Sequence, residues 1–258
     1  MMRIAALQMR AAAGDPVANL ARIERAAGEA AAAGAAVLVA PELAVTGYGA
    51  GEAIRALAEG ADGPLVDRLA AIAAGAGIAI VCGIAERVGE DVYNSALLVD
   101  GSGRQLVYRK SHLYGPYERG LFRPGQPAAA TADLGGLKVG LLICYDVEFP
   151  ENVRRLAQAG VDLVIVPTAL PATDDGAFIA EKMIAVRAFE NQLFIAYVNH
   201  CGGDERFAYA GLSTIVAPDG TVLAGAEAAD EALLVADIDP DAFAASRAAN
   251  TYLDDLRT

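Results

Sequence analysis

Residues 140–151 read GLLICYDVEFPE, and this stretch decides the fold. Residues 138–143, which lead into Cys144, have the length and apolar content of a buried β-strand. Beyond Cys144, Asp146 can cap a helix, and Pro150 with its flanking glutamates suits a first helical turn. We therefore expect Cys144 on a tight turn from strand to helix, at the edge of a sheet.

Cys144 then has two interpretations. Backbone amides at a helix start lower the pKa of a thiol and can bind a developing oxyanion, which favours a nucleophile. Free cysteine is also among the most buried residue types, so the same pattern fits an inert core residue. The stretch alone leaves both interpretations open.

The rest of the chain alternates strands with helices. Residues 4–9 and 36–40 read as strands around a helix that opens at Asp15-Pro16, an order typical of a right-handed βαβ unit. Further strands are expected at residues 78–84, 92–99, 105–108, 163–166, 194–199, 212–217, 221–224 and 233–238, and helices at 52–59, 64–74, 150–159 and 178–191. These strands suffice for two mixed β-sheets packed face to face, with helices outside, in a single α/β domain spanning residues 1–258. Residues 110–133 lack periodicity, and a loop of that length is typically functional.

Composition narrows the class of protein. The chain has 258 residues, 55% of them hydrophobic, and a net charge of −13, which argues against nucleic acid or an anionic membrane surface as a partner. Its three cysteines lie far apart without metal-ligand spacing, so we expect no metal, no cofactor and a cytoplasmic location. The N-terminus lacks the apolar length of a signal peptide, and no run is long enough to cross a membrane.

Three charged residues stand where chemistry could occur. Glu42 follows the strand at 36–40, at the rim where α/β sheets bind ligands, although a helix cap or a loop charge is the plain alternative. Lys110 follows the strand at 105–108, and Glu118 lies among aromatic residues that would raise its pKa. A thiol nucleophile needs a base, which a glutamate can supply, and nothing in the sequence marks either histidine for that role.

The chain resembles the nitrilase, or carbon–nitrogen hydrolase, superfamily. Each matching motif is weak alone, but together they occur in the family's order over nearly the whole chain. They are APEL at 40–43 with TGY at 46–48, YRKSHL at 108–113, Glu118 with FRPG at 122–125, CYD at 144–146 with FPE at 149–151, RAFENQ at 187–192, GLS at 211–213 with PDG at 218–220, and YLDDLR at 252–257.

The resemblance implies a role for each candidate. Cys144 would be the nucleophile, Glu42 the general base and Lys110 the cation that stabilises the oxyanion. Glu118 would orient Lys110 and the substrate. The remaining expected oxyanion-binding or substrate-binding residues are Tyr145, through its backbone amide, and Tyr48, Tyr117, Thr168 and Ala169. The implied fold is a four-layer α-β-β-α sandwich, and the implied assembly is a homodimer or a larger homo-oligomer.

The residues after the nucleophile suggest the branch of the superfamily. Tyr145-Asp146, followed by the FPE motif, resembles the amidase-type branches, so we expect hydrolysis of a small-molecule amide through a thioester. A nitrilase or an N-carbamoyl-amino-acid amidohydrolase is the alternative, and Arg119 or Arg123 could then hold a substrate carboxylate. A catalytically silent binding or scaffold member is a further alternative, although all four expected catalytic residues are present. Leu170 and the alanines beside it favour an apolar substrate pocket over one built for a charged group.

Overall fold

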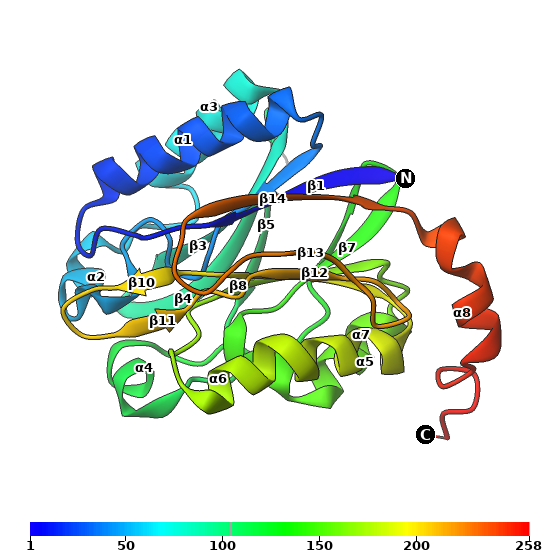
Figure 1. Ribbon diagram of the computed structural model, residues 1–258. Helices are drawn as coiled ribbons and strands as arrows, with labels where there is room; N and C mark the ends of the chain where they lie inside the picture. The colour runs from blue at the N-terminus through cyan, green and yellow to red at the C-terminus, as the bar shows by residue number, and fades with distance from the viewer. Residues whose placement is uncertain (104, 258) are drawn as a thin grey trace.

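The computed structural model describes residues 1–103 and 105–257. The expected domain spans residues 1–258, of which Arg104 and Thr258 lie outside the described residues. The described chain forms a single domain of four layers, helix, sheet, sheet and helix, as the sequence predicts (Figure 1).

The first sheet is mixed, with the strand order β14-β1-β2-β3-β4-β5. Its three central strands run parallel to one another, and the flanking strands pair antiparallel. The strands are β1 (Met2–Gln8), β2 (Val37–Val39), β3 (Ala79–Val88), β4 (Asp91–Val99), β5 (Gln105–Arg109) and β14 (Ala232–Ile238). This arrangement brings the ends of β2 and β5, where Glu42 and Lys110 were noted, into one sheet.

The second sheet is also mixed, with the order β13-β12-β9-β8-β7-β6. Strands β7, β8 and β9 are parallel, so the residues that follow β7 and β8 emerge side by side. The strands are β6 (Thr131–Leu134), β7 (Leu137–Leu141), β8 (Leu163–Thr168), β9 (Phe194–Asn199), β12 (Thr214–Val216) and β13 (Val222–Gly225). A separate pair, β10 (Cys201–Gly203) with β11 (Ala208–Ala210), was not expected from the sequence.

Helices cover the outer faces of both sheets. Helices α1 (Pro16–Ala32) and α3 (Pro64–Ala76) lie on the first sheet, and α5 (Pro150–Gln158) and α7 (Ile184–Asn191) lie on the second (Figure 1). Asp15 caps α1 by accepting from the Ala18 amide at 3.0 Å, which confirms the predicted helix start. The remaining helical elements are η1 (Tyr48–Ala50), α2 (Ala53–Leu57), α4 (Gly115–Leu121), η2 (Cys144–Glu148), α6 (Asp174–Phe178), η3 (Ile179–Met183), η4 (Pro240–Phe243) and α8 (Ala244–Ala249).

The main core lies between the two sheets. Alternation along β1 sends Ile4 and Ala6 into this layer and Ala5 toward the helices outside. From the second sheet, Val139 and Ile165 lie on the side facing away from α5 and join this layer, and all of these side chains are fully buried. Packing of this kind fixes the distance between the sheets, and therefore between the residues at their ends.

Two sequence predictions need correction. The segment 110–133 contains α4 and the start of β6, and α4 is too short for helical periodicity to be visible. The expected helix at 178–191 is three pieces, α6, the π-helical turn η3 and α7, which begin earlier at Asp174.

Gly83 in β3 lets the segment after β2 cross directly over the sheet. Its amide donates to the Pro41 carbonyl at 3.0 Å. A Cβ at this position would lie 2.6 Å from Glu42 Cα and would collide with the backbone of Leu43, whose own φ is +49°. The absence of a side chain at Gly83 therefore sets the height of Glu42 above the sheet.

Replacing Gly83 with alanine should displace the Glu42 segment. We expect a loss of about 1–3 kcal/mol in the free energy of unfolding, the usual scale of overpacking, with loss of activity. The matched control is Gly75→Ala at an exposed position of α3, where the added methyl group meets nothing within 4 Å. The control should gain up to about 1 kcal/mol. Urea unfolding measures both variants, and an unchanged Gly83→Ala protein would refute this role for Gly83.

Candidate active site

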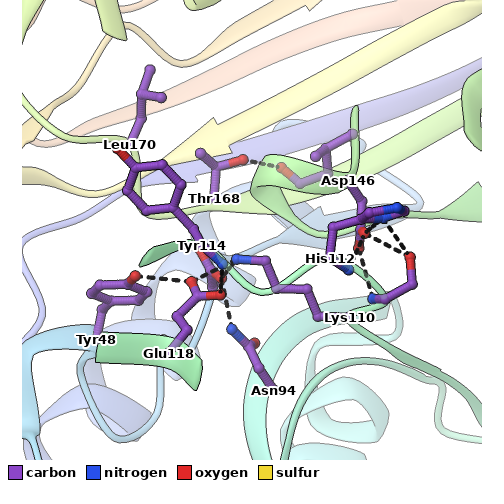
Figure 2. A network of polar contacts seen from close by, with 12 residues as sticks. Tyr48, Asn94, Lys110, His112, Tyr114, Glu118, Asp146, Thr168 and Leu170 are labelled. Carbon is purple, nitrogen blue, oxygen red and sulfur yellow. Dashed lines mark hydrogen bonds and ion pairs between the residues drawn. The ribbon is translucent and has the colours of Figure 1, made fainter. Parts of the chain in front are cut away.

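The structure brings three fully buried charges together. Lys110 Nζ lies 2.7 Å from Glu42 Oε1 and 2.6 Å from Glu118 Oε1. Glu42 comes just after β2, Lys110 directly after β5, and Glu118 from the first turn of α4. Figure 2 shows Lys110 and Glu118 pointing toward one another. Two glutamates, one 68 and the other 8 residues from Lys110 in sequence, thus converge on one ammonium group.

Neutral groups donate further hydrogen bonds to the two carboxylates. Asn94 Nδ2 donates to Glu42 Oε1 at 2.7 Å, and the Tyr48 hydroxyl donates to Glu118 Oε1 at 2.8 Å. The Tyr114 amide donates to Glu118 Oε2 at 2.7 Å. Glu42 Oε2, although buried, has no hydrogen-bond partner among the described residues. A buried carboxylate oxygen without a donor is free to accept a proton from a reacting group.

Burial and charge set the protonation of this cluster. Burial alone would lower the pKa of Lys110, but the Glu118 and Glu42 carboxylates outweigh it and raise that pKa well above its ordinary value. Burial also raises the pKa of Glu118, against the opposing effect of Lys110. Lys110 is therefore a permanent cation at neutral pH.

Cys144 lies at the start of η2, directly beyond the second sheet, on a strained turn. Its φ is +44°, a left-handed conformation that costs a residue with a side chain about 1–2 kcal/mol. Burial raises the pKa of its thiol well above the ordinary value, Glu42 adds to the rise, and Lys110 and the Ala169 amide oppose it. The expectation of a thiol pKa lowered by a helix start was wrong, because α5 begins only at Pro150 and desolvation dominates at Cys144.

A cavity of about 430 Å³ opens on Cys144. Among the expected substrate-binding residues, Tyr48, Tyr145 and Ala169 line it. Tyr117 instead lines an adjoining apolar cavity of about 170 Å³, and its hydroxyl donates to the Tyr48 carbonyl at 2.6 Å. Thr168 lines neither cavity, because its buried hydroxyl turns back to the Val166 carbonyl at 3.0 Å.

The predicted apolar surface of the substrate cavity is present, and two acidic residues that were not predicted line the same cavity. Leu170, Pro171 and Met183 supply apolar surface. Glu148 and Asp175 supply carboxylates. Glu148 was assigned to the start of α5, and only the path of η2 around Cys144 turns it toward the cavity.

Asp146 does not cap a helix; it ties the turn that carries Cys144 to the segment that carries Lys110 and Ser111. Its fully buried carboxylate accepts from the Tyr108 hydroxyl at 3.0 Å, the Ser111 hydroxyl at 2.7 Å and the His112 amide at 2.9 Å. The predicted cap was wrong because this network outweighs a local capping bond, and Phe149 occupies the cap position of α5. Figure 2 shows Asp146 beside His112. Cys144 and Lys110 are thereby held in register across the two sheets.

Arg187 of α7 holds the same turn from the other side. It pairs with Glu190 at 3.0 Å, as its spacing predicts, and also donates to the carbonyls of Val147 at 3.0 Å and Glu148 at 2.8 Å. The turn that carries Cys144 is therefore fixed at both ends.

Neither histidine is placed as the base for Cys144. His112 Nδ1 lies 2.9 Å from Asp146 Oδ1, and the ring stacks on Phe149. His200 Nε2 lies 2.7 Å from the Glu42 carbonyl, and burial lowers its pKa. Both histidines thus support the backbone around the site. Across residues 1–103 and 105–257, no group of three or more His, Cys, Asp or Glu could hold a metal ion.

Comparison with known proteins assigns the family. Residues 3–248 match the carbon-nitrogen hydrolase family, and the chain belongs to it. A protein named "Hydrolase in pqqF 5'region" from Pseudomonas protegens is 46% identical over 99% of this chain and 89% of its own length. An (R)-stereoselective amidase from a Pseudomonas species is 38% identical over 99% of this chain and 92% of its own length.

Solved structures agree with this assignment. The NitN amidase from Nesterenkonia superposes with a TM-score of 0.89 at 38% identity, covering 100% of this chain and 97% of that chain. In one variant of that amidase, acrylamide has added to the active-site cysteine, and another variant is in complex with butyramide. The protein is thus a nitrilase-superfamily hydrolase of the amidase type, acting on carbon–nitrogen bonds other than peptide bonds. Within the described ranges, no helix is both long and apolar enough to cross a membrane.

Changing Asp146 to asparagine should loosen the registration of Cys144 against Lys110. The new amide group would face hydrogen-bond donors, which costs about 1–3 kcal/mol in the free energy of unfolding. We expect kcat to fall further than this loss of stability explains. Asp67→Asn, at an exposed position of α3, is the control, and it should change neither the free energy of unfolding nor kcat appreciably. Urea unfolding and steady-state kinetics on one amide test this, and a stable, fully active Asp146→Asn protein would contradict it.

Proposed function

We propose that this protein hydrolyses small carboxamides to a carboxylate and ammonia through a thioester on Cys144. The supporting observation is the arrangement of Lys110 between Glu42 and Glu118 in a buried site. All three charges act on the Cys144 thiol and shift its pKa. In this proposal Glu42 is the general base, Lys110 the oxyanion-stabilising cation and Glu118 the residue that orients Lys110.

Acylation begins from the neutral thiol, because the raised pKa of Cys144 keeps it protonated at neutral pH. The free Oε2 of Glu42 takes the thiol proton while sulfur bonds to the amide carbon. The carbonyl electrons move to oxygen to form a tetrahedral oxyanion. When the carbonyl re-forms, the C–N bond breaks, the nitrogen takes the proton from Glu42, and ammonia leaves.

Lys110 is suited to the oxyanion because it has one hydrogen to spare. An ammonium group carries three N–H donors, and the two carboxylates occupy two of them. The third can donate to the oxyanion, together with the backbone amide of Tyr145. Charge stabilisation of this kind in a water-poor site is worth about 3–4 kcal/mol per donor.

Deacylation repeats these roles with water. Glu42 takes a proton from water while the water oxygen bonds to the thioester carbon. The C–S bond then breaks, and the Cys144 sulfur recovers the proton from Glu42. The product is a carboxylic acid, which gives its remaining proton to ammonia or to bulk water and becomes a carboxylate, and the enzyme returns to its starting state.

Placement of the arginines favours an amide over a carbamoyl amino acid as the substrate. Arg119 is exposed and donates to the Leu113 carbonyl, and Arg123 is exposed and paired with Asp91. Neither lines the cavity beside Cys144, so neither is available for a substrate carboxylate. The acrylamide and butyramide bound to the Nesterenkonia amidase are likewise small neutral amides.

We further propose that residues 1–258 act as one carbon–nitrogen hydrolase domain, supported by the family match over residues 3–248. We propose a homodimer or larger homo-oligomer, supported by large apolar side chains exposed on α6, α7 and the C-terminal segment. These are Phe178, Val186, Tyr252 and Leu256. We also propose a cytoplasmic location, supported by the three free cysteines. The net charge of −13 supports the proposal that neither nucleic acid nor a membrane is a partner.

Removing the nucleophile should abolish turnover without unfolding the protein. We expect Cys144→Ala to lose at least about 10³-fold in kcat while keeping the wild-type thermal midpoint, because the proposed chemistry passes through the sulfur. Cys201→Ala, at a buried position outside the cavity, is the control. Ammonia release measures activity. Mass spectrometry of the wild type quenched with substrate should show an acyl group on Cys144, and wild-type rates in Cys144→Ala would sink the assignment.

The bond that is cut can be read from a matched panel of substrates. Butyramide, butyronitrile and an N-carbamoyl amino acid should give rapid ammonia release only for the amide. Rapid nitrile hydrolysis with an inert amide would establish the nitrilase alternative instead. Turnover of none of the three, by a folded wild-type protein, would favour the binding or scaffold alternative.

A further inference from the structure

The cavity beside Cys144 carries an unexpected charge pattern. Besides Glu118, which is already bound to Lys110, two carboxylates line it, Glu148 from η2 and Asp175 from α6. No lysine or arginine is among the described residues that line it. Leu170 and Met183 lie between as apolar surface. The charged side chains among these lining residues are thus all acidic.

Glu148 is the carboxylate placed to meet a substrate. It ends the short turn that Cys144 begins, and the Arg187 guanidinium binds its backbone carbonyl at 2.8 Å. Its position is therefore rigid relative to the nucleophile. Within residues 1–103 and 105–257, its half-buried carboxylate makes no hydrogen bond or ion pair of its own. The backbone of Glu148 is thus held in place, while its carboxylate has no partner among the described residues.

The nearby cations are already engaged. Arg187 of α7 is paired with Glu190, and Lys110 is held between Glu42 and Glu118. Tyr197 of β9 also lies near enough to Glu148 for the two side chains to interact electrostatically. Burial raises the pKa of Glu148 to about 7, with Lys110 and Arg187 acting in the opposite direction. Above that pH the group is a half-buried carboxylate without a counter-ion, and a bound cation would relieve its cost.

We propose that Glu148 is a specificity-determining residue, and that the cavity selects amides whose acyl chain carries a protonated amine. In this arrangement the amide carbonyl meets Cys144, the chain lies along Leu170 and Met183, and the ammonium group binds Glu148. Asp175, exposed at the mouth, adds attraction for the incoming cation. The proposal rests on the amidase function proposed above and names its substrate class as amino-acid amides.

Amides of equal shape and different charge test this proposal. 3-Aminopropanamide and butyramide differ only in an ammonium group for a methyl group, and 4-aminobutanamide with pentanamide extends the pair by one carbon. At pH 8 the wild type should favour one of the cationic amides over its neutral partner by about tenfold in kcat/KM, the scale of a hydrogen bond to a charged group. Succinamate, with a carboxylate at the same end, should be the poorest substrate.

The preference should depend chiefly on Glu148. Glu148→Gln keeps the shape and removes the charge, so the ratio of kcat/KM for the cationic amide over its neutral partner should fall to about one, whatever happens to the absolute rate on butyramide. Glu151→Gln is the matched control, because this exposed glutamate of α5 changes the net charge equally from outside the cavity. In the wild type, the preference should fade as pH drops through about 7, since Glu148 becomes protonated there. This pH profile needs no variant, so it remains decisive if Glu148→Gln does not fold.

The outcomes separate this proposal from the one beneath it. Equal turnover of neutral and cationic partners at every chain length, with butyramide hydrolysed, would overturn the role of Glu148 and leave the amidase function intact. Equal losses on both partners in Glu148→Gln would show a merely structural role. Failure of the wild type to hydrolyse any amide would instead overturn the amidase function.

Discussion

One buried ammonium group between two carboxylates is the interaction on which the site depends. Removing three charges from water is costly, and the cost is met because Lys110 Nζ lies within 2.7 Å of both the Glu42 and the Glu118 carboxylate, while Asn94 and Tyr48 add donors. Each charge arrives from a different element, so the cluster forms only when the first sheet and α4 are in place. Loss of Lys110 would leave two buried carboxylates without a counter-ion, whereas loss of either glutamate would leave one buried ion pair.

The nucleophile turn is under an independent constraint. Cys144 has a left-handed backbone, and such a conformation persists only where its surroundings enforce it. Asp146 fastens the turn to the segment after β5, and Arg187 fastens it to α7. The proposed chemistry therefore depends on two sets of fixed geometry, one in each sheet, that meet in a single water-poor space.

Much of this arrangement could be predicted from the sequence, where the signal was local or matched a family motif. The strand before Glu42 and the strand before Lys110 were visible as apolar runs, and both residues lie where those strands end. The functions of Asp146 and Glu148 could not be predicted, because each depends on contacts with residues far away in sequence. Asp146 was assigned to a cap, whereas its partners lie in and after β5. The short helix α4 escaped detection because seven residues are too few to establish a helical period.

The two halves of the site belong to different sheets, and this has a mechanical consequence. Glu42 and Lys110 extend from the first sheet, whereas Cys144 extends from the second, so the apolar layer between the sheets acts as the spacer of the reacting groups. A shift of one sheet against the other would therefore separate Cys144 from Glu42 even while every strand remained intact. Enzymatic activity should therefore report a change in the packing between the two sheets that a measurement of secondary-structure content would miss.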